Sequence, residues 1–312
     1  MNNPTLTLHS FAKINCSLRI HGKRSDGYHN LVTVLQTVSL SDDLTFTPRD
    51  DEQLILTCDD SSIPLERNLV VRAGKLLQTC GARGGANIEL IKRIPSAGGL
   101  GGGSSNAAIT LIGLSDLWDV EGIDLWQLAS QLGADVPFFL IGGRAKGEGT
   151  GATVVPLSDV DKKFLIIVSP LSKISTASAY DAWDSRSLTS ARSDPILTGS
   201  LAEAISTDCD QSALHNDFEA VIFEIEPEIE RAKMELLNSG ADGALLAGSG
   251  SSVFGIFASE EARGKALERL NCEQGWKVFC CETLGRNDYL AQIGISESRV
   301  LSVLRKLSNT GA

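Results

Sequence analysis

The sequence predicts an α+β protein in which helices cover one side of a largely antiparallel sheet. Three observations support this class. Apolar residues alternate with a period of two along much of the N-terminal stretch, as they do in strands. Apolar residues at three- and four-residue intervals, as in a buried helix, follow a glycine-rich segment at 98–103. In the second half, strand and helix patterns follow one another in a mixed order.

The elements follow from these two periods, taken in chain order. The first half contains predicted strands at 14–20, within 31–46, at 54–56 and at 88–90, and predicted helices at 68–80, 107–118 and 124–132. The second half contains predicted strands at 164–168, near 244, near 253 and near 278, and predicted helices from about 177, through about 218, at 227–238 and at 260–270. A polar insertion is expected between 185 and 200.

A chain of 312 residues is long enough for two lobes. The polar loop at 156–163 is the expected boundary between them. It divides an N-terminal domain at 1–158 from a C-terminal domain at 159–312. An extended tail starts at about residue 286, is helical by spacing at 297–307, and has no assigned role.

The charge and hydropathy of the chain exclude several classes of partner. A net charge of −11 argues against sequence-independent binding to nucleic acid or to an anionic membrane, since both need clustered Lys and Arg. The sequence has no apolar run of about 18 residues and begins without the basic and apolar regions of a secretory signal. We therefore expect a cytoplasmic protein that acts on a small molecule. Composition does not indicate an oligomeric state.

The strongest local signal is a glycine-rich segment between a predicted strand and a predicted helix, with five glycines at 98–103. Glycines let the backbone curve closely around a ligand, and the free N–H groups of a helix start bind anions. A flexible linker is the alternative, but a linker has no reason to separate a buried strand from a buried helix. The spacing matches neither a Walker A loop nor, except loosely, the dinucleotide fingerprint. The predicted nucleotide-phosphate site consists of Pro95, Ser96, Ala97, Gly98, Gly99, Leu100, Gly101, Gly102, Gly103, Ser104 and Ser105. The two serines are expected to cap the helix.

Three weaker clusters have a structural and a functional interpretation each. Asp135, in Gly-Ala-Asp-Val-Pro, is either a turn residue or a base that takes a proton from a substrate hydroxyl. Lys13 and Asn15 share one face of the first strand, where a lysine is usually just solvated. The glycine-serine loop at 247–252 is either an ordinary turn or a loop that closes over the ligand of the first glycine segment.

In this order, the four segments resemble the superfamily of small-molecule kinases that includes galactokinase, homoserine kinase, mevalonate kinase and phosphomevalonate kinase. The resemblance covers nearly the whole chain. Its most discriminating part, Gly-Lys-Arg-Ser-Asp-Gly-Tyr-His at 22–29, is similar to the branch that phosphorylates the 2-hydroxyl of a cytidine-diphosphate-linked methylerythritol with ATP, on the non-mevalonate route to isoprenoid precursors. The resemblance implies a two-lobed kinase fold with the active site in the cleft between the lobes.

The resemblance also implies roles for individual residues. Lys13 and Asp135 would be the catalytic pair, in which the lysine favours the ionised carboxylate and stabilises the developing alkoxide. Tyr28 and His29 would hold the cytosine by stacking and hydrogen bonding. Asn15 would lie near the methylerythritol.

The remaining implied contacts are weaker. Asn68 would lie near the adenine, and Ser251 is a further candidate on the closing loop. Mg²⁺ is expected with ATP because the charge of the transferred phosphate must be neutralised, and Ser105 is a candidate metal ligand.

Two alternatives stay open. A related kinase acting on homoserine or on a mevalonate derivative would not need Tyr28 and His29. A nucleotide-binding regulator without catalysis would not need both Lys13 and Asp135.

Overall fold

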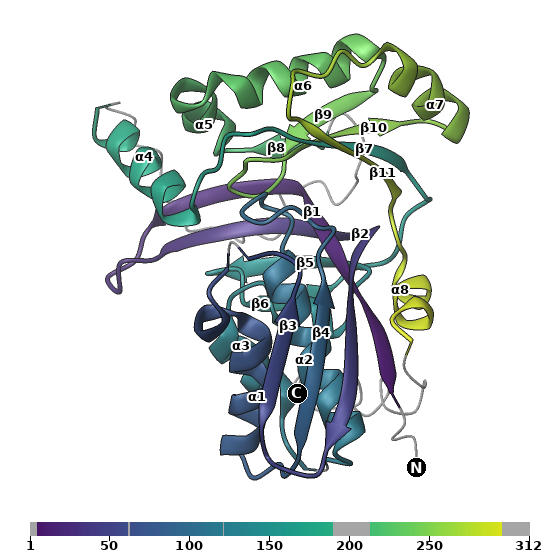
Figure 1. Cartoon of the computed structure of the whole chain (residues 1–312). Coiled ribbons are helices and arrows are strands. Elements are labelled where there is room, and N and C mark those ends of the chain that lie inside the picture. Colours follow the sequence, from purple (N-terminus) through teal and green to yellow (C-terminus); the bar gives the residue numbers. More distant parts are fainter. Residues whose placement is uncertain (1–4, 62, 121, 190–212, 295–312) are drawn as a thin grey trace.

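A computed structural model describes residues 5–61, 63–120, 122–189 and 213–294, arranged around two sheets (Figure 1). The larger sheet has seven strands in the order β3-β4-β2-β1-β8, with β5 pairing with β2 and with β6. Among the described strands of this sheet, only the β3–β4 and β1–β8 pairs are parallel. Its strands are β1 (Leu6–Lys23), β2 (His29–Arg49), β3 (Leu54–Cys58), β4 (Gly85–Ile91), β5 (Arg144–Gly149), β6 (Thr153–Pro156) and β8 (His215–Asn216).

The smaller sheet is antiparallel throughout and has the order β11-β7-β10-β9. Its strands are β7 (Phe164–Ser169), β9 (Gly243–Leu246), β10 (Val253–Phe257) and β11 (Lys277–Glu282). The helices α5 (Glu219–Ile225), α6 (Pro227–Ser239) and α7 (Glu260–Arg269) lie on the outer side of this sheet (Figure 1). The helix α4 (Thr176–Thr189) stands beside them, next to the end of the long β1–β2 hairpin (Figure 1).

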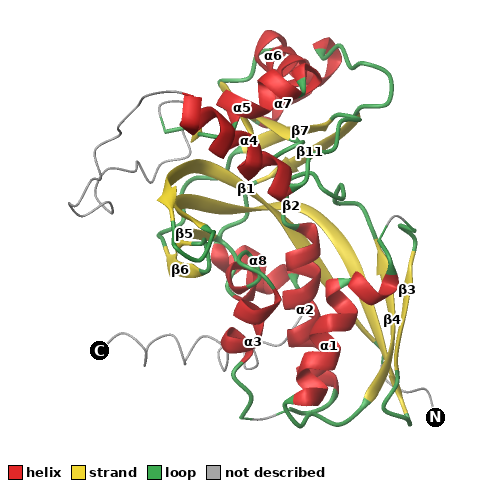
Figure 2. Ribbon diagram, turned by 90° about the vertical axis from the view of Figure 1, so that its left-hand side faces the viewer, coloured by secondary structure: helices red, strands yellow, loops and turns green. Residues whose placement is uncertain are grey.

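The helices of the first lobe cover one face of the larger sheet (Figure 2). They are η1 (Leu65–Arg67), α1 (Leu69–Thr79), α2 (Gly102–Leu117), α3 (Leu125–Leu132), η2 (Pro137–Leu140) and, from the chain's other half, α8 (Arg286–Gln292). The central helix α2 is apolar nearly all round and is buried along most of its length, as expected of a core helix. At Gly113 it approaches the sheet so closely that a Cβ atom would lie 2.8 Å from the Phe46 ring.

The long strand β1 runs through the three apolar cores that the described residues form. Leu8 packs in the core under α2, Ile14 in the core between the two sheets, and Leu18 in the core of the second lobe. This continuity places the middle of β1 between the lobes and carries the β1–β2 hairpin out to α4 (Figures 1 and 2). Lys13 therefore lies where the lobes meet.

The predicted fold class is confirmed, and most of the predicted elements are present, but three features differ. The strands β5 and β6 were not predicted, because Arg-Ala-Lys-Gly-Glu-Gly carries almost no apolar alternation and pairs through its backbone with β2. A helix was expected to run through about 218; the described residues at its end contain β8, with α5 after them, and its earlier part lies outside the described residues. The tail from 286 starts with α8, whose Tyr289 is buried in the core of the first lobe.

The domain boundary at 158/159 stays a prediction. The β7 strand that follows it opens the second sheet, while β8, from the second half, joins the first sheet. Most of the expected polar insertion at 185–200, and the expected helix at 297–307, lie outside the described residues. The insertion's first residues belong to α4.

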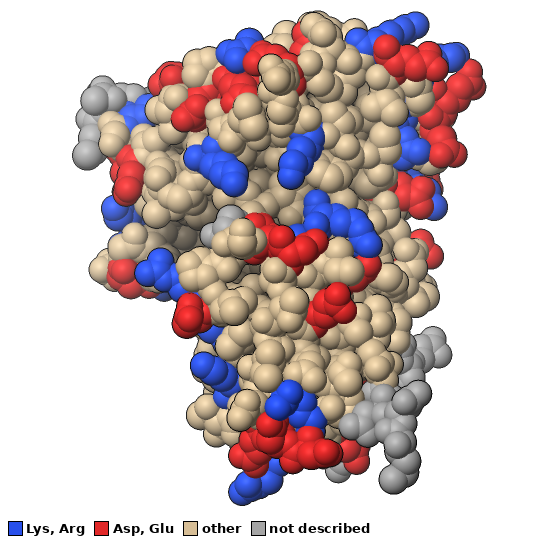
Figure 3. Space-filling model, in the orientation of Figure 1, with Lys and Arg blue, Asp and Glu red and all other residues tan. Residues whose placement is uncertain are grey.

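On the face shown in Figure 3, acidic and basic side chains are interspersed over both lobes. In the part of the chain that the structure describes, none of the helices combines the length and the apolar character needed to span a lipid bilayer.

Candidate active site

A cavity of about 1110 Å³ lies between the lobes and collects most of the residues predicted for the site. Its walls come from β1, the β1–β2 hairpin, the glycine-rich segment, the loop at 133–135, α4 and the loop at 248–249. Ligand pockets usually measure about 300–1,000 Å³, so this cavity has room for more than one ligand group.

Lys13 lines the cavity, and its side chain is only 4% exposed. Its ammonium group donates a hydrogen bond to Asn15 Oδ1 at 2.7 Å and lies 3.5 Å from Asp135 Oδ2. Asn15 in turn donates to Thr33 Oγ1 at 2.7 Å, which holds the amide oriented toward the lysine. Lys13 is therefore not simply exposed to water, as a lysine on a strand face usually is. Its ammonium group is buried, and Asn15 and Asp135 compensate for the loss of water around the charge.

Asp135 follows the end of α3 at Gly133 and precedes the short helix η2. Phe138 and Phe139 are fully buried and anchor this segment in the core. Among the described residues Asp135 makes no capping hydrogen bond, and its carboxylate, 36% exposed, lines the cavity. The arrangement leaves one carboxylate open to a ligand, next to a fixed positive charge.

The glycine-rich segment curls through left-handed backbone positions at Ala97, Gly99 and Gly101, and α2 begins at Gly102. A Cβ atom on Gly99 would lie 1.8 Å from the Ala247 carbonyl oxygen. The N–H groups at the start of a 16-residue helix have no partners within that helix, so they and the helix dipole favour an anion. This end of the cavity therefore presents backbone N–H groups of the kind that bind anions.

The second glycine-serine loop is joined to the first by its backbone. Ser251 donates its N–H to Ala97 O at 3.4 Å, and Ser252 donates to Gly98 O at 3.1 Å. Gly248 and Ser249 line the cavity, whereas Ser251 is 2% exposed and does not line it. The two loops therefore meet at one cavity. Ser251 lies outside the cavity lining and links the two loops through its backbone N–H.

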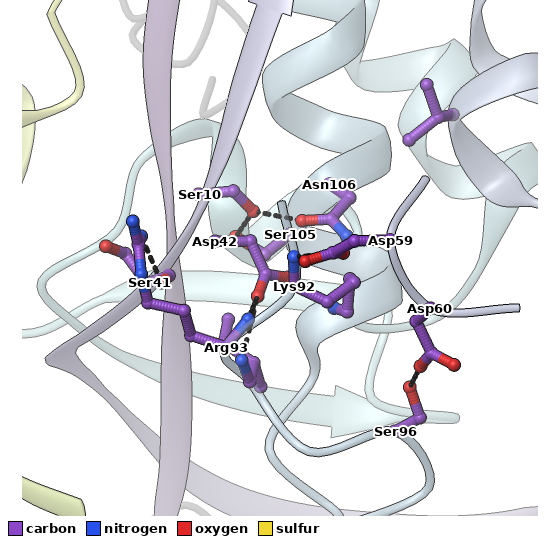
Figure 4. Close-up of polar contacts among 12 residues, drawn as sticks. Ser10, Ser41, Asp42, Asp59, Asp60, Lys92, Arg93, Ser96, Ser105 and Asn106 are labelled. Carbon is purple, nitrogen blue, oxygen red and sulfur yellow. Dashed lines mark hydrogen bonds and ion pairs between the residues drawn. The ribbon is translucent and has the colours of Figure 1, made fainter. Parts of the chain in front are cut away.

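Ser104 and Ser105 do not cap the helix as predicted, because α2 begins two residues earlier with Gly101 at the cap position. Ser105 is fully buried, and its hydroxyl lies 2.8 Å from that of Ser10, which also donates to Asn106 Oδ1 at 2.6 Å (Figure 4). These bonds fasten α2 to β1. Ser104 lines the cavity and Ser105 does not, so this placement argues against Ser105 as a metal ligand.

A buried ion pair supports the strand that leads into the glycine-rich segment, and the sequence did not indicate it. Asp42 is fully buried and pairs with Lys92, while its other oxygen accepts the N–H groups of Arg93 and Ile94 at 2.7 and 2.8 Å (Figure 4). Lys92 lines the cavity, and its Nζ lies 3.2 Å from where a Cβ on Gly102 would be. It therefore adds positive charge beside the helix start.

Asn68 caps α1, where its side chain accepts the Val70 N–H at 3.0 Å. It is 5% exposed and lines the same cavity as Pro95 and Ser96. This end of the cavity is formed by the start of α1 and by the glycine-rich segment together.

The far end of the cavity lies between the β1–β2 hairpin and α4. Tyr28 projects into solvent with 66% of its surface exposed, and His29 is 7% exposed. The His29 ring stacks on Tyr180 with centroids 4.8 Å apart, and its Nε2 lies 2.6 Å from Asp184 Oδ1. Burial and the charge of Asp135 raise the pKa of Tyr180 to about 12, so its hydroxyl stays protonated.

Sequence reasoning missed Tyr180 and Asp184 because nothing in the spacing of α4 distinguishes them from other residues of that helix. All of the other predicted site residues except Ser105 and Ser251 line the cavity. No group of three or more His, Cys, Asp or Glu side chains comes together among the described residues as a metal site.

Two family models match this chain, "GHMP kinases N terminal domain" over residues 68–143 and "GHMP kinases C terminal" over residues 197–275. The first match contains α1, the glycine-rich segment and the Asp135 loop. The second reaches from the part of the chain outside the described residues across β9 and β10 to the loop before β11.

Curated proteins and solved structures agree with these matches. A 4-diphosphocytidyl-2-C-methyl-D-erythritol kinase of Syntrophus aciditrophicus (strain SB) is 38% identical over 89% of this chain and 99% of the relative. A crystal structure of 4-(cytidine 5'-diphospho)-2C-methyl-D-erythritol kinase superposes with a TM-score of 0.74 at 32% identity, covering 90% of this chain and all of that one. A homoserine kinase from Cytophaga hutchinsonii shares the fold, with a TM-score of 0.65 at 20% identity over 91% of this chain and 96% of that one.

Proposed function

Because this chain belongs to the 4-diphosphocytidyl-2-C-methyl-D-erythritol kinase family of the GHMP kinases, we propose that it transfers the γ-phosphoryl group of ATP to the 2-hydroxyl of that substrate. The reaction belongs to the non-mevalonate route to isoprenoid precursors. The observation that supports it most is the Lys13–Asp135 pair, 3.5 Å apart in the cavity that the glycine-rich segment also lines.

The proposed mechanism assigns one task to each part of the cavity. The glycine-rich segment and the start of α2 bind the triphosphate through backbone N–H groups. Asp135 accepts the proton of the attacking hydroxyl, and Lys13, held by Asn15, stabilises the negative charge that develops on that oxygen. Phosphoryl transfer depends mostly on positioning and charge stabilisation, which this arrangement supplies.

Magnesium is proposed as the ion that accompanies ATP. Mg²⁺ keeps several waters and takes few protein ligands when phosphates bind it, so a dedicated acidic cluster is not required. The residue that fits this role is Ser104, whose hydroxyl oxygen is a suitable ligand and which lines the cavity at the start of α2. When bound, the ion would neutralise phosphate charge.

The substrate end of the cavity supports the cytidine diphosphate acceptor over the acceptors of related kinases. Homoserine and mevalonate are small, and neither carries an aromatic base. Here the cavity extends past the catalytic pair to Tyr28, His29 and Tyr180, which offer flat apolar faces and a polar ring edge. Retention of both Lys13 and Asp135 supports a kinase over a regulator without catalysis.

A coupled assay of ADP release tests the proposal. It uses ATP, Mg²⁺ and 4-diphosphocytidyl-2-C-methyl-D-erythritol, with homoserine and mevalonate as alternative acceptors. We expect turnover only with the cytidylated acceptor. Turnover with homoserine or mevalonate alone would overturn the acceptor, and binding of ATP without any turnover would favour the regulator.

A further inference from the structure

The helix α8 packs against the segments that carry the proposed catalytic pair, yet none of its residues lines the cavity. It lies among the helices of the first lobe, although it follows the second lobe in the chain (Figure 2). Its Tyr289 is fully buried and belongs to the same apolar core as Phe11 and Phe139. Neither phenylalanine lines the cavity either. Any influence of α8 on the site must therefore pass through the residues between them.

One contact of Tyr289 is a hydrogen bond to the loop of Asp135. Its hydroxyl donates to the carbonyl oxygen of Phe139, in the short helix η2 that follows Asp135. The last carbonyls of a helix have no partner within that helix, so this hydroxyl caps η2. Burial raises the pKa of Tyr289 above its ordinary value, so the hydroxyl keeps the proton that it donates.

Phe139 is in turn tied to both members of the pair. Its N–H donates to Val136 O at 3.1 Å, and Val136 is the residue after Asp135. Its ring packs against the glycine-rich segment, since a Cβ atom on Gly101 would lie 2.8 Å from Cζ of this ring and 3.0 Å from Cγ of Lys13. A shift of the Phe139 backbone would therefore change the position of Asp135 relative to Lys13.

The other contact of Tyr289 is to the strand of Lys13. The edge of its ring meets the ring of Phe11, with centroids 5.8 Å apart and an interplanar angle of 61°. Phe11 is 4% exposed and lies two residues before Lys13 in β1. One side chain thus contacts both the strand of Lys13 and the loop of Asp135, whose charged groups are 3.5 Å apart in the cavity.

Two glycines directly after η2 make room for α8. Gly142 and Gly143 both have positive φ. A Cβ atom on Gly142 would lie 2.2 Å from the Tyr289 ring, and one on Gly143 would lie 2.7 Å from the Arg286 backbone. Arg286 also donates from Nη2 to Arg144 O at 2.6 Å. The position of α8 relative to η2 is therefore closely defined by packing and by hydrogen bonds.

We propose that Tyr289 is a positioning residue for phosphoryl transfer, which sets the spacing of Lys13 and Asp135 from behind the cavity. A general base works only within hydrogen-bond reach of the proton that it takes. A displacement of about 1 Å caused by a distant change can lower a rate about 100-fold. This inference rests on the proposed function, because it takes Asp135 as the proton acceptor.

The first test is Tyr289→Phe in the full chain, which removes the hydroxyl and keeps the ring. We expect kcat in the ADP-release assay to fall about tenfold, while KM for ATP and KM for the cytidylated acceptor change less than about twofold. Thermal unfolding checks that the variant is folded. A wild-type kcat in the folded variant would overturn the inference, and so would raised KM values at unchanged kcat.

A matched control is a buried hydroxyl that bonds to a helix carbonyl in the second lobe. Ser239 is 3% exposed and donates to Leu236 O at 2.8 Å near the end of α6, and neither residue lines the cavity. Ser239→Ala should lower the melting temperature as Tyr289→Phe does, but leave kcat at its wild-type value. The same loss of kcat in both variants would reduce the role of Tyr289 to general stability and overturn the inference.

A double variant separates the proposed route from other routes to a lower rate. If Tyr289 acts by placing Asp135, its hydroxyl should matter little once the carboxylate no longer accepts the proton. We expect Tyr289→Phe to lower the residual kcat of Asp135→Asn by less than about twofold. The same loss in this background as in the wild-type background would contradict the inference.

Amide hydrogen exchange tests the contact without any turnover. In the wild type, peptides covering 136–142 and 286–292 should exchange together as denaturant is added, because the hydrogen bond joins η2 and α8 in one cooperative unit. In Tyr289→Phe, exchange at 136–142 should become faster, and in Ser239→Ala it should not change. Independent exchange of the two segments in the wild type would overturn the inference even if Tyr289→Phe did not fold.

The outcomes also separate this inference from the proposed function. If the wild type turns over the cytidylated acceptor and Tyr289→Phe keeps its kcat, the function stands and the role of Tyr289 is rejected. If no acceptor is turned over but the two segments exchange together and Tyr289→Phe abolishes this coupling, Tyr289 still holds the Asp135 loop and the function is rejected.

Discussion

The two ends of the cavity are built in different ways. The end proposed to bind the phosphates of ATP, here called the phosphate end, is mostly backbone, formed by one continuous segment from Pro95 to Ser104 whose shape depends on glycines at positive φ. The base end is mostly side chains, assembled from the hairpin at 22–29 and from α4, more than 150 residues later. A site formed by the backbone of one loop can be recognised from contiguous residues. A site formed by side chains from distant segments depends on tertiary packing.

This difference predicts that changes at one end leave the other intact. The Lys13–Asp135 pair adjoins the glycine-rich segment, since Lys13 donates its backbone N–H to Leu100 O at 2.9 Å. Variants at the three places should therefore separate chemistry, nucleotide binding and acceptor binding from one another.

The largest effect is expected from Asp135→Asn, which removes the proposed proton acceptor and keeps the shape of the side chain. Loss of a general base typically costs about 10²–10⁴-fold in rate. We expect kcat to fall in that range while both ends still bind their ligands, as measured by ADP release and by titration with an ATP analogue. Wild-type turnover in this variant would remove Asp135 from the mechanism.

A smaller effect is expected from Gly99→Ala at the phosphate end. A side chain there meets the Ala247 carbonyl at 1.8 Å and needs a left-handed backbone, so we expect about 2–3 kcal/mol less stability and weaker ATP binding. Chemical denaturation and ATP titration measure the two. Affinity for cytidine 5'-diphosphate should change much less.

The control for this substitution is Gly264→Ala in the middle of α7, where a Cβ meets nothing within 4 Å. Alanine should stabilise that helix by up to about 1 kcal/mol. If both alanine variants unfolded at the same denaturant concentration, the close approach at Gly99 would not matter for the fold.

The smallest effect is expected from Tyr28→Ala at the base end. The ring is 66% exposed, so its loss should leave the melting temperature unchanged. Stacking of a base on an aromatic ring is worth about 1–3 kcal/mol, so KM for the cytidylated acceptor should rise roughly tenfold or more. Steady-state kinetics should show KM for ATP unchanged, and equal increases in both constants would mean that the base lies elsewhere.

The sequence predicted the parts of the site that depend on residues close together in the chain. The glycine-rich segment is contiguous and lies between a strand and a helix, and alternation placed Lys13 and Asn15 on one face of β1. The capping role of Ser104 and Ser105 was wrong because glycine is a poor helix former, so the pattern favoured a later start. In the structure α2 begins at Gly102, where a Cβ atom would lie 2.9 Å from the Ile94 side chain.

The sequence did not predict what depends on long-range register. Asp184 meets His29 only because β1 and β2 carry the hairpin out to α4, and Asp42 meets Lys92 only because β2 and β4 pair. Neither contact can be recognised from the residues next to it in the sequence. The resemblance to a kinase family supplied Tyr28 and His29, but not Tyr180 and Asp184, which contact His29.

The most direct test of this account is a crystal structure with a non-hydrolysable ATP analogue and the cytidylated acceptor bound together. The decisive quantity is the distance from the acceptor's 2-hydroxyl oxygen to the nearest carboxylate oxygen of Asp135. We predict about 2.6–3.2 Å, with the γ-phosphate at the start of α2 and the cytosine beside Tyr28 and His29. A 2-hydroxyl beyond hydrogen-bond reach of Asp135 in such a complex would contradict the account.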